Sequence, residues 1–254
     1  MNDKNKIVIG NLKMYGSKAS NQEHLGLLKK DLNNLKKAHV GLCLPYPYLF
    51  QAQSVLEGTQ LGWGSQNVAK SDNGPFTGEV SASMLQDFGC KYVIVGHSER
   101  STAYCESNEN IATKFKVVVD HGMTPVLCVG ETLIEREAGI MERVVSGQLE
   151  TIINNYGPQL FKNTVIAYEP IWAIGSDLAA SPEQANAMCT FIREFIEGEN
   201  NAKIEGLKII YGGSVNSENA LQLFVLETVD GGLVGRGSLK PEEFIKICKI
   251  ADQI

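Results

Sequence analysis

The sequence predicts an α/β protein, a closed (β/α)8 barrel of eight parallel strands that forms a single domain over residues 1–254. Three observations lead to this prediction. Eight short apolar runs recur along the chain, each followed by a helical pattern. Most runs, such as KIVIG and YVIVG, are apolar at nearly every position, as in strands buried on both faces of a parallel sheet. No Pro- or Gly-rich linker divides the 254 residues, a length typical of one such barrel.

The expected strands are rich in Val, Ile, Leu and Tyr, and they cover residues 6–10, 40–44, 60–64, 92–96, 125–130, 164–168, 207–211 and 232–235. An open, doubly wound sheet is the alternative arrangement for the same alternation. It is disfavoured because no G-x-G-x-x-G motif follows the first strand.

The helices between the strands are predicted from apolar spacing and from start signals. In residues 20–37, four leucines recur at helical spacing. The helix after the sixth strand begins in SPEQ, where Ser181 is the expected N-cap, Pro182 the first helical residue and Gln184 the partner in a capping box. The last two helices are expected at residues 218–226 and 241–250.

Composition excludes several classes of function. The net charge is -6 and the pI is about 5.3, so the chain lacks the basic face that nucleic-acid binding needs. No apolar run is long enough for a membrane span, and the N-terminus has no secretory signal. The six cysteines are scattered without a C-x-x-C motif. We therefore expect a cytoplasmic protein with reduced, mostly buried thiols.

Residues suited to catalysis come shortly after three of the expected strands. Glu169 follows TVIAY, His97 lies two residues after YVIV, and Lys13 follows the first strand in GNLKMYG. Active sites of such barrels lie at the carboxyl ends of the strands, so these side chains should meet. A carboxylate there can act as a base, a neutral imidazole can donate a hydrogen bond, and an ammonium can stabilise an anion. Taken alone, Glu169 is better explained by a structural role, and His97 is at least as consistent with one. A structural role fits Lys13 less well, because it follows a strand end with Asn11 two residues earlier.

The Gly-rich turns YGGSVN and VGRGS follow the seventh and eighth expected strands. Phosphate sites in barrels of this kind are often built there, because glycine lets backbone N–H groups approach the anion. No His or Asp cluster has the spacing of a catalytic metal site, so no metal is expected. The other histidines, His24, His39 and His121, are expected to be structural.

Six motifs occur in order between residues 10 and 240: GN-x-KM, GPFTGE, VGHSER, AYEPIWAIG, YGGSV and LVG-x-x-SL. In sequence and spacing they resemble the triosephosphate isomerase family. The resemblance covers essentially the whole chain. It implies a TIM barrel that interconverts dihydroxyacetone phosphate and D-glyceraldehyde 3-phosphate by proton transfer through an enediolate, in glycolysis and gluconeogenesis. It implies no cofactor, because proton transfer alone requires none.

The resemblance also implies a role for each matching residue. Glu169 would remove the proton next to the substrate carbonyl, and neutral His97 would relay a proton between the substrate oxygens. Lys13 would supply positive charge near the oxyanion and the phosphate. Asn11 would order this corner, and Glu99 would lie beside Lys13 and His97.

Three further features follow from the same resemblance. A mobile lid would begin with Pro170, Ile171, Trp172, Ala173, Ile174, Gly175, Ser176 and Asp177. The phosphate would be bound at Gly175, Ser214, Gly235 and Arg236, together with Asn11 and Lys13. Residues 66–79 would form the loop of a homodimer, with Thr77 reaching the active site of the partner.

The sequence departs from the family pattern at five positions. Leu12 and Tyr15 stand where Trp and Asn are common, which predicts local repacking. Ser101 replaces an Arg after HSER, which removes a cation from the dimer side. Asp177 replaces a lid Gly, and Arg236 replaces a Gly of the phosphate turn, where we expect its side chain to point away from the anion.

Three alternatives to an active isomerase remain. An aldolase would need a Schiff-base Lys at a central strand end, and a metal-using epimerase would need His or Asp ligands at strand ends; neither pattern is present. A degenerate phosphate-binding barrel that acts as a binding or interaction protein should have lost Lys13, His97 or Glu169, yet all three are present.

Overall fold

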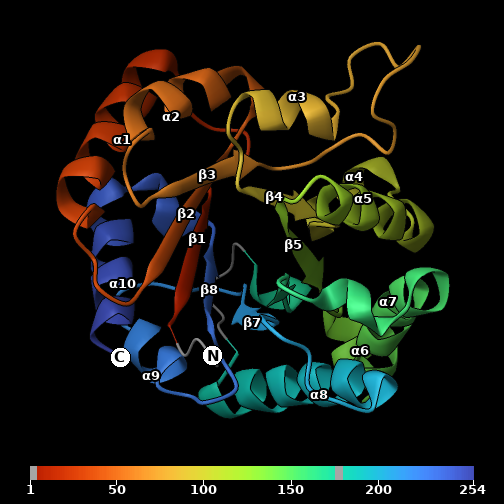
Figure 1. The fold of residues 1–254 in the computed structure, drawn as a ribbon. Helices are drawn as coiled ribbons and strands as arrows, with labels where there is room; N and C mark the ends of the chain where they lie inside the picture. The colour runs from red at the N-terminus through yellow and green to blue at the C-terminus, as the bar shows by residue number, and fades with distance from the viewer. Residues whose placement is uncertain (1–4, 175–179) are drawn as a thin grey trace.

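The computed structural model describes residues 5–174 and 180–254, and in it eight parallel strands close into a barrel in chain order (Figure 1). Ile7 of the first strand pairs with His39 of the second and with Gly231 of the eighth, which closes the barrel. The predicted fold class is therefore confirmed. The strands are β1 Ile7–Asn11, β2 His39–Leu44, β3 Gly62–Ser65, β4 Tyr92–Val95, β5 Thr124–Val129, β6 Val165–Tyr168, β7 Lys208–Tyr211 and β8 Gly231–Val234.

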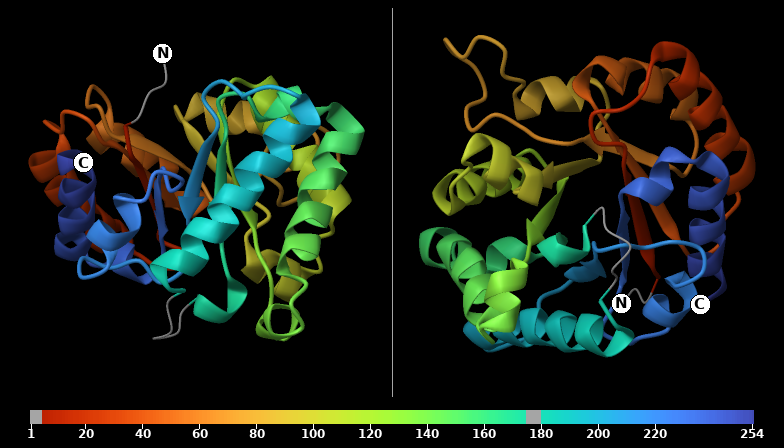
Figure 2. Two further views of the ribbon diagram at one scale, coloured as in Figure 1. Left: turned by 90° about the horizontal axis from the view of Figure 1, so that it is seen from below. Right: turned by 180° about the vertical axis from the view of Figure 1, so that it is seen from behind.

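Helices surround the barrel on the outside, and at least one follows every strand (Figure 2). They are α1 Lys18–Leu32, α2 Leu49–Leu56, α3 Ala82–Asp87, α4 Ser98–Tyr104, α5 Asn108–Asp120, α6 Leu133–Glu137, α7 Met141–Tyr156, α8 Pro182–Asn200, α9 Ala220–Phe224 and α10 Pro241–Gln253. Short 3-10 turns are η1 Tyr46–Tyr48, η2 Pro158–Phe161, η3 Ile171–Ala173 and η4 Arg236–Leu239.

Apolar side chains fill the interior of the barrel, so the barrel is a packed core. Tyr92 of β4 is the bulkiest of them. Its ring occupies the space that Gly41 of β2 and Gly62 of β3 leave open, because a Cβ atom at either glycine would lie 2.6 or 2.5 Å from the ring. A second apolar layer lies between the strands and the helices.

The capping box predicted before α8 is present. The Ser181 side chain accepts a hydrogen bond from the Gln184 N–H at 3.2 Å, and the Gln184 side chain accepts one from the Ser181 N–H at 2.9 Å. Pro182 is the first helical residue, as expected. This cap fixes where the chain re-enters regular structure after the segment that follows Glu169.

The first helix differs from the prediction at both ends. It was expected at residues 20–37 and covers Lys18–Leu32, with Ser17 as its N-cap. Distant parts of the chain set the early end. The carboxylate of Asp252 accepts the N–H groups of residues 36, 37 and 38, and the Gln60 amide donates to the carbonyl oxygens of Leu32 and Leu35. The backbone groups that would have continued the helix are therefore used elsewhere.

Five of the six cysteines are buried and all six are free thiols, as predicted; Cys105 is exposed. Within residues 5–174 and 180–254, no helix combines the length and the apolar character needed to cross a membrane.

Candidate functional site

A cavity of about 240 Å³ opens at the carboxyl ends of the strands. Its lining brings together the four residues predicted to act on the substrate: Asn11 at the end of β1, Lys13 after β1, His97 after β4 and Glu169 after β6. These residues are far apart in the sequence. The closed parallel barrel places them at one rim because every strand ends on the same side.

Glu169 is 3% exposed, and its carboxylate faces the imidazole of His97, with 3.5 Å between Glu169 Oε1 and His97 Nε2. Glu169 Oε2 is buried and has no hydrogen-bond partner among the described residues. A buried carboxylate oxygen without a donor costs free energy, so such an atom is suited to accept a proton.

The backbone around Glu169 is held tightly. The Glu169 N–H donates to the carbonyl of Val129 at 2.7 Å, and the Ile171 N–H donates to that of Glu131 at 2.9 Å. Gly130 lies between these two acceptors, and a Cβ atom there would lie 1.9 Å from the carbonyl oxygen of Glu169. Glycine is therefore required at position 130, and the main chain of Glu169 cannot shift without breaking these contacts.

His97 is the N-cap of α4, and its Nδ1 accepts the backbone N–H of Glu99 at 3.2 Å. Because Nδ1 accepts a hydrogen bond, the proton of the neutral ring is on Nε2, which faces Glu169. The arrangement therefore presents the Nε2–H group to the cavity as a hydrogen-bond donor.

Lys13 has a left-handed backbone with φ of +50°, which is uncommon for a residue with a Cβ. Two side chains hold it there: Asn11 Oδ1 accepts the Lys13 N–H at 2.9 Å, and Gln66 Nε2 donates to the Lys13 carbonyl at 2.9 Å. The ammonium pairs with the carboxylate of Glu99, which also lies beside His97 Nδ1. Lys13 lines the cavity, and Asn11 and Glu99 both contact it.

The two Gly-rich turns form the other wall of the cavity, which Gly212, Gly213, Ser214, Gly235 and Arg236 line. Gly235 lies next to Lys13, since a Cβ atom at 235 would be 3.5 Å from Lys13 Cε. Ser238 ties this turn to β1, because its hydroxyl donates to the carbonyls of Gly235 and Asn11. The glycine-rich wall and the ammonium of Lys13 thus face one space.

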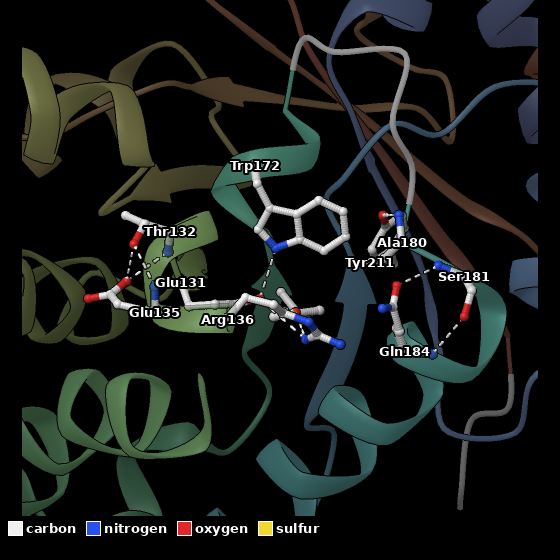
Figure 3. A network of polar contacts seen from close by, with 10 residues as sticks. Glu131, Thr132, Glu135, Arg136, Trp172, Ala180, Ser181, Gln184 and Tyr211 are labelled. Atoms are coloured by element: carbon white, nitrogen blue, oxygen red, sulfur yellow. Dashed lines mark hydrogen bonds and ion pairs between the residues drawn. The ribbon is translucent and has the colours of Figure 1, made fainter. Parts of the chain in front are cut away.

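Glu131 follows β5 and is fully buried, with the donors of three residues around one of its oxygens (Figure 3). Glu131 Oε1 accepts from Tyr168 OH at 3.0 Å, Trp172 Nε1 at 3.1 Å and an Arg136 nitrogen at 3.3 Å. Burial, and then the nearby carboxylate, raise the pKa of the Tyr168 hydroxyl. Glu131 thereby connects β6 to the start of the segment after Glu169.

The far end of that segment is held by Tyr211, the last residue of β7 (Figure 3). Its hydroxyl accepts the backbone N–H of Ala180 at 3.0 Å, and both residues are buried. Burial raises the pKa of Tyr211 to about 12, although the Ala180 N–H opposes the shift, so the hydroxyl stays protonated at neutral pH. Trp172 and Ala180 are thus both anchored to barrel residues.

Comparison with known proteins agrees with this geometry. The family model described as triosephosphate isomerase matches residues 6–251. The chain belongs to the triosephosphate isomerase family. It is 49% identical to the triosephosphate isomerase of Nitrosomonas eutropha over 95% of this chain and 96% of the relative. It is 50% identical to that of Thiobacillus denitrificans over 97% of this chain and 98% of the relative.

The remaining members of the predicted site lie as follows. Ser214, Gly235 and Arg236 line the same cavity as the catalytic candidates. Gly175, Ser176 and Asp177 lie outside the described residues, whereas Pro170, Ile171, Trp172, Ala173 and Ile174 are described. Arg236 is exposed, and the expected direction of its side chain stays a prediction. In the described part of the chain, no group of three His, Cys, Asp or Glu residues is placed to hold a metal ion.

Sequence reasoning assigned no role to Glu131 or Tyr211. Glu131 stands in CVGET, directly after a strand, which is the same signal that singled out Glu169. Tyr211 reads as the last apolar residue of a strand, and only the fold places its hydroxyl against Ala180. Tyr15, a departure from the family pattern, also lines the cavity.

Proposed function

We propose that the protein is a triose-phosphate isomerase that interconverts dihydroxyacetone phosphate and D-glyceraldehyde 3-phosphate without a cofactor. The observation that supports this most strongly is the 3.5 Å approach of Glu169 Oε1 to His97 Nε2 in the cavity that Lys13 also lines. An isomerisation of this kind moves one proton between two carbons and one between two oxygens. A carboxylate and a neutral imidazole side by side supply both transfers.

The proton on carbon goes first to the carboxylate of Glu169. The electron pair left on the carbon moves toward the carbonyl oxygen, and the His97 Nε2–H hydrogen-bonds and protonates that oxygen. His97 then takes the proton of the neighbouring hydroxyl oxygen, and Glu169 returns its proton to the adjacent carbon. The ring begins and ends neutral, consistent with the hydrogen bond that Nδ1 accepts from Glu99.

Lys13 stabilises the negative charge that develops on the substrate oxygen and helps to bind the phosphate. Asn11 supports it by holding the backbone of Lys13. The phosphate lies against the turns that contain Ser214, Gly235 and Arg236, where the glycines allow close approach of the main chain.

We further propose that the segment from Pro170 to Asp177, with Gly175 as a phosphate contact, closes over the cavity as a lid. Its described flanks support this role because Trp172 and Ala180 both bond to buried side chains of the barrel. A closed lid would exclude water and protect the enediolate from loss of phosphate.

A homodimer is the proposed assembly. The segment of residues 70–79, which includes Thr77, is largely exposed and extends away from the barrel before α3 (Figure 1). A groove of about 290 Å³, lined by Met14, Glu99 and Tyr104 among others, lies beside Lys13 and could receive the same segment of a second copy. We also propose that the protein is cytoplasmic and that it acts in glycolysis and gluconeogenesis.

The test is an isomerisation assay on glyceraldehyde 3-phosphate with the wild-type protein, Glu169→Gln and Glu205→Gln. We expect turnover by the wild type, at least ~10²-fold less with Glu169→Gln, and no change with Glu205→Gln. Glu205 is a matched control because it pairs with Lys162 on the surface, where its side chain is 70% exposed. A folded wild-type protein without turnover would support the alternative of a barrel that only binds.

A further inference from the structure

Gln148, on α7, bonds to both backbone polar groups of Gly130, the residue directly after β5. Gln148 Oε1 accepts the Gly130 N–H at 2.9 Å, and Gln148 Nε2 donates to the Gly130 carbonyl at 3.0 Å. A side-chain amide offers an acceptor and donors, as a peptide group does, so it can pair with main chain in the way that a neighbouring strand pairs. No step of the proposed reaction involves Gln148.

The residues on either side of Gly130 hold the segment that contains the proposed base. The carbonyl of Val129 accepts the Glu169 N–H at 2.7 Å. The carbonyl of Glu131 accepts the Ile171 N–H at 2.9 Å. In extended chain, successive residues direct their backbone groups to alternate sides, so those of Gly130 are directed away from β6.

On that other side, the neighbouring strand has already ended. The pairing of β4 with β5 stops at Val95 and Leu127, three residues before Gly130. Gly130 is buried, so its N–H and carbonyl require partners within the protein. Gln148 supplies both, and it thereby takes the place of a strand beside the end of β5.

The packing of α7 directs Gln148 to this position. Val145, Leu149 and Ile152 are fully buried against the barrel. Gln148 lies three residues after the first and four before the last of them, so it shares their face of the helix. A half-buried amide in an apolar face needs hydrogen-bond partners, and Gly130 provides them.

We propose that Gln148 is a positioning residue for Glu169. It holds Gly130 from the side of α7, and so keeps the two neighbouring carbonyls in line with the N–H groups that they accept. The main chain of Glu169 is thereby fixed from across the strand end. The inference rests on the proposed isomerase function, because the position of Glu169 affects the rate only if its carboxylate removes a proton. Gln148 is not part of the cavity lining that the described residues form, so it acts through Glu169.

Gln148→Met tests this role, because methionine has a similar length and offers neither hydrogen bond. The buried groups of Gly130 would then lack partners, and the residue would shift to find others. A displacement of a reacting group by about 1 Å can cost about 10²-fold in rate. Only part of the movement reaches Glu169, so we expect kcat to fall about tenfold and KM to change less than about threefold. Gln148→Asn, which is too short to reach both groups, should act in the same direction and serves if Gln148→Met fails to fold.

Gln60→Leu is the matched control. The Gln60 amide also makes two hydrogen bonds to main chain, to the carbonyls of Leu32 and Leu35 at the end of α1. Neither residue belongs to the cavity lining. Gln60→Leu should lower the thermal stability and leave kcat within about twofold of the wild type.

A second comparison separates positioning of the base from a general structural role. Residues that act as a unit have non-additive effects on the rate. In Glu169→Gln the base is already removed, so adding Gln148→Met should lower the remaining rate by less than about twofold. A tenfold loss in this background as well would overturn the inference, because Gln148 would then act independently of Glu169.

Amide hydrogen exchange, followed by NMR on the whole protein, tests the inference without reference to activity. In Gln148→Met, the N–H groups of Glu169 and Ile171 should exchange at least about tenfold faster than in the wild type, relative to that of buried Ile9 in β1. Gln60→Leu should leave this ratio unchanged. An unchanged ratio in Gln148→Met overturns the inference, and so does a kcat within twofold of the wild type in both Gln148 variants. A folded wild-type protein without turnover refutes the proposed function instead, and the exchange ratio then decides whether Gln148 fixes this segment.

Discussion

Gly212 limits the position of the catalytic carboxylate, and Gly212→Ala therefore gives a quantitative test of the site. A Cβ atom at position 212 would lie 2.6 Å from Glu169 Cγ. Ordinary van der Waals contact begins at 3.4 Å, so one of the two residues must move by about 0.8 Å. Gly212 has no positive φ, so alanine introduces no backbone strain of its own.

The main chain on both sides is fixed, which leaves the side chain of Glu169 to move. The Gly212 N–H donates to the carbonyl of Tyr168 at 2.7 Å, and the Glu169 N–H donates to that of Val129 at 2.7 Å. Displacement of a reacting group by about 1 Å can cost about 10²-fold in rate. We expect kcat to fall about 30- to 100-fold, equivalent to about 2–2.7 kcal/mol in the barrier, with KM changed less than about threefold.

The assay is steady-state isomerisation at 25 °C, with thermal unfolding of each variant measured alongside. Gly147→Ala is the matched control, because Gly147 lies within α7 and a Cβ atom there meets nothing within 4 Å. It should keep full activity and gain about 0.5–1 kcal/mol of stability. A folded Gly212→Ala protein with kcat within threefold of the wild type would refute the reasoning.

Two further predictions concern residues outside the reacting centre. Tyr211→Phe leaves the buried Ala180 N–H without its acceptor, which costs about 1–3 kcal/mol. We expect kcat/KM to fall about tenfold. A change below twofold in steady-state kinetics would contradict the anchoring role of Tyr211. The pKa of Asp252 lies below its ordinary value. Burial raises this pKa, but the hydrogen bonds from the N–H groups of Ala38, Lys37 and Lys36 together outweigh burial. Its bonds therefore stabilise the fold above the unfolded pKa of about 3.9, and this contribution is lost as pH falls through the lower folded value. Denaturant titrations should find Asp252→Asn less stable than the wild type at pH 7, with the gap closing in acid; a gap that is the same at every pH would show the charge is irrelevant.

Much of the fold was predictable because the signals are local. A parallel strand buried on both faces is a short continuous apolar run, and a capping box such as that of Ser181 and Gln184 lies within four residues. The end of α1 was not predictable, because Asp252 and Gln60 set it from distant parts of the chain. No local pattern in residues 33–37 indicates that their backbone groups bond to these distant residues.

The candidate site shows the same difference between local features, which the sequence reveals, and contacts between distant residues, which it does not. Lys13, His97 and Glu169 were recognisable as polar residues within two positions of a strand end, and the closed barrel explains why that position matters. The left-handed conformation of Lys13 was not recognisable, since it depends on the side chains of Asn11 and Gln66. The shared role of Glu131 and Tyr211 at the two flanks of one segment also required the fold, because their partners lie on other elements.

The backbone contacts around Glu169 have a consequence for how the chain can vary in length. The carbonyl groups of Val129 and Glu131, two residues apart at the end of β5, accept the N–H groups of Glu169 and Ile171, which are two residues apart after β6. The two segments therefore advance in step. An insertion or deletion on either side would break this match and displace the carboxylate. Relatives should therefore keep the number of residues constant from Val129 to Glu131 and from Glu169 to Ile171.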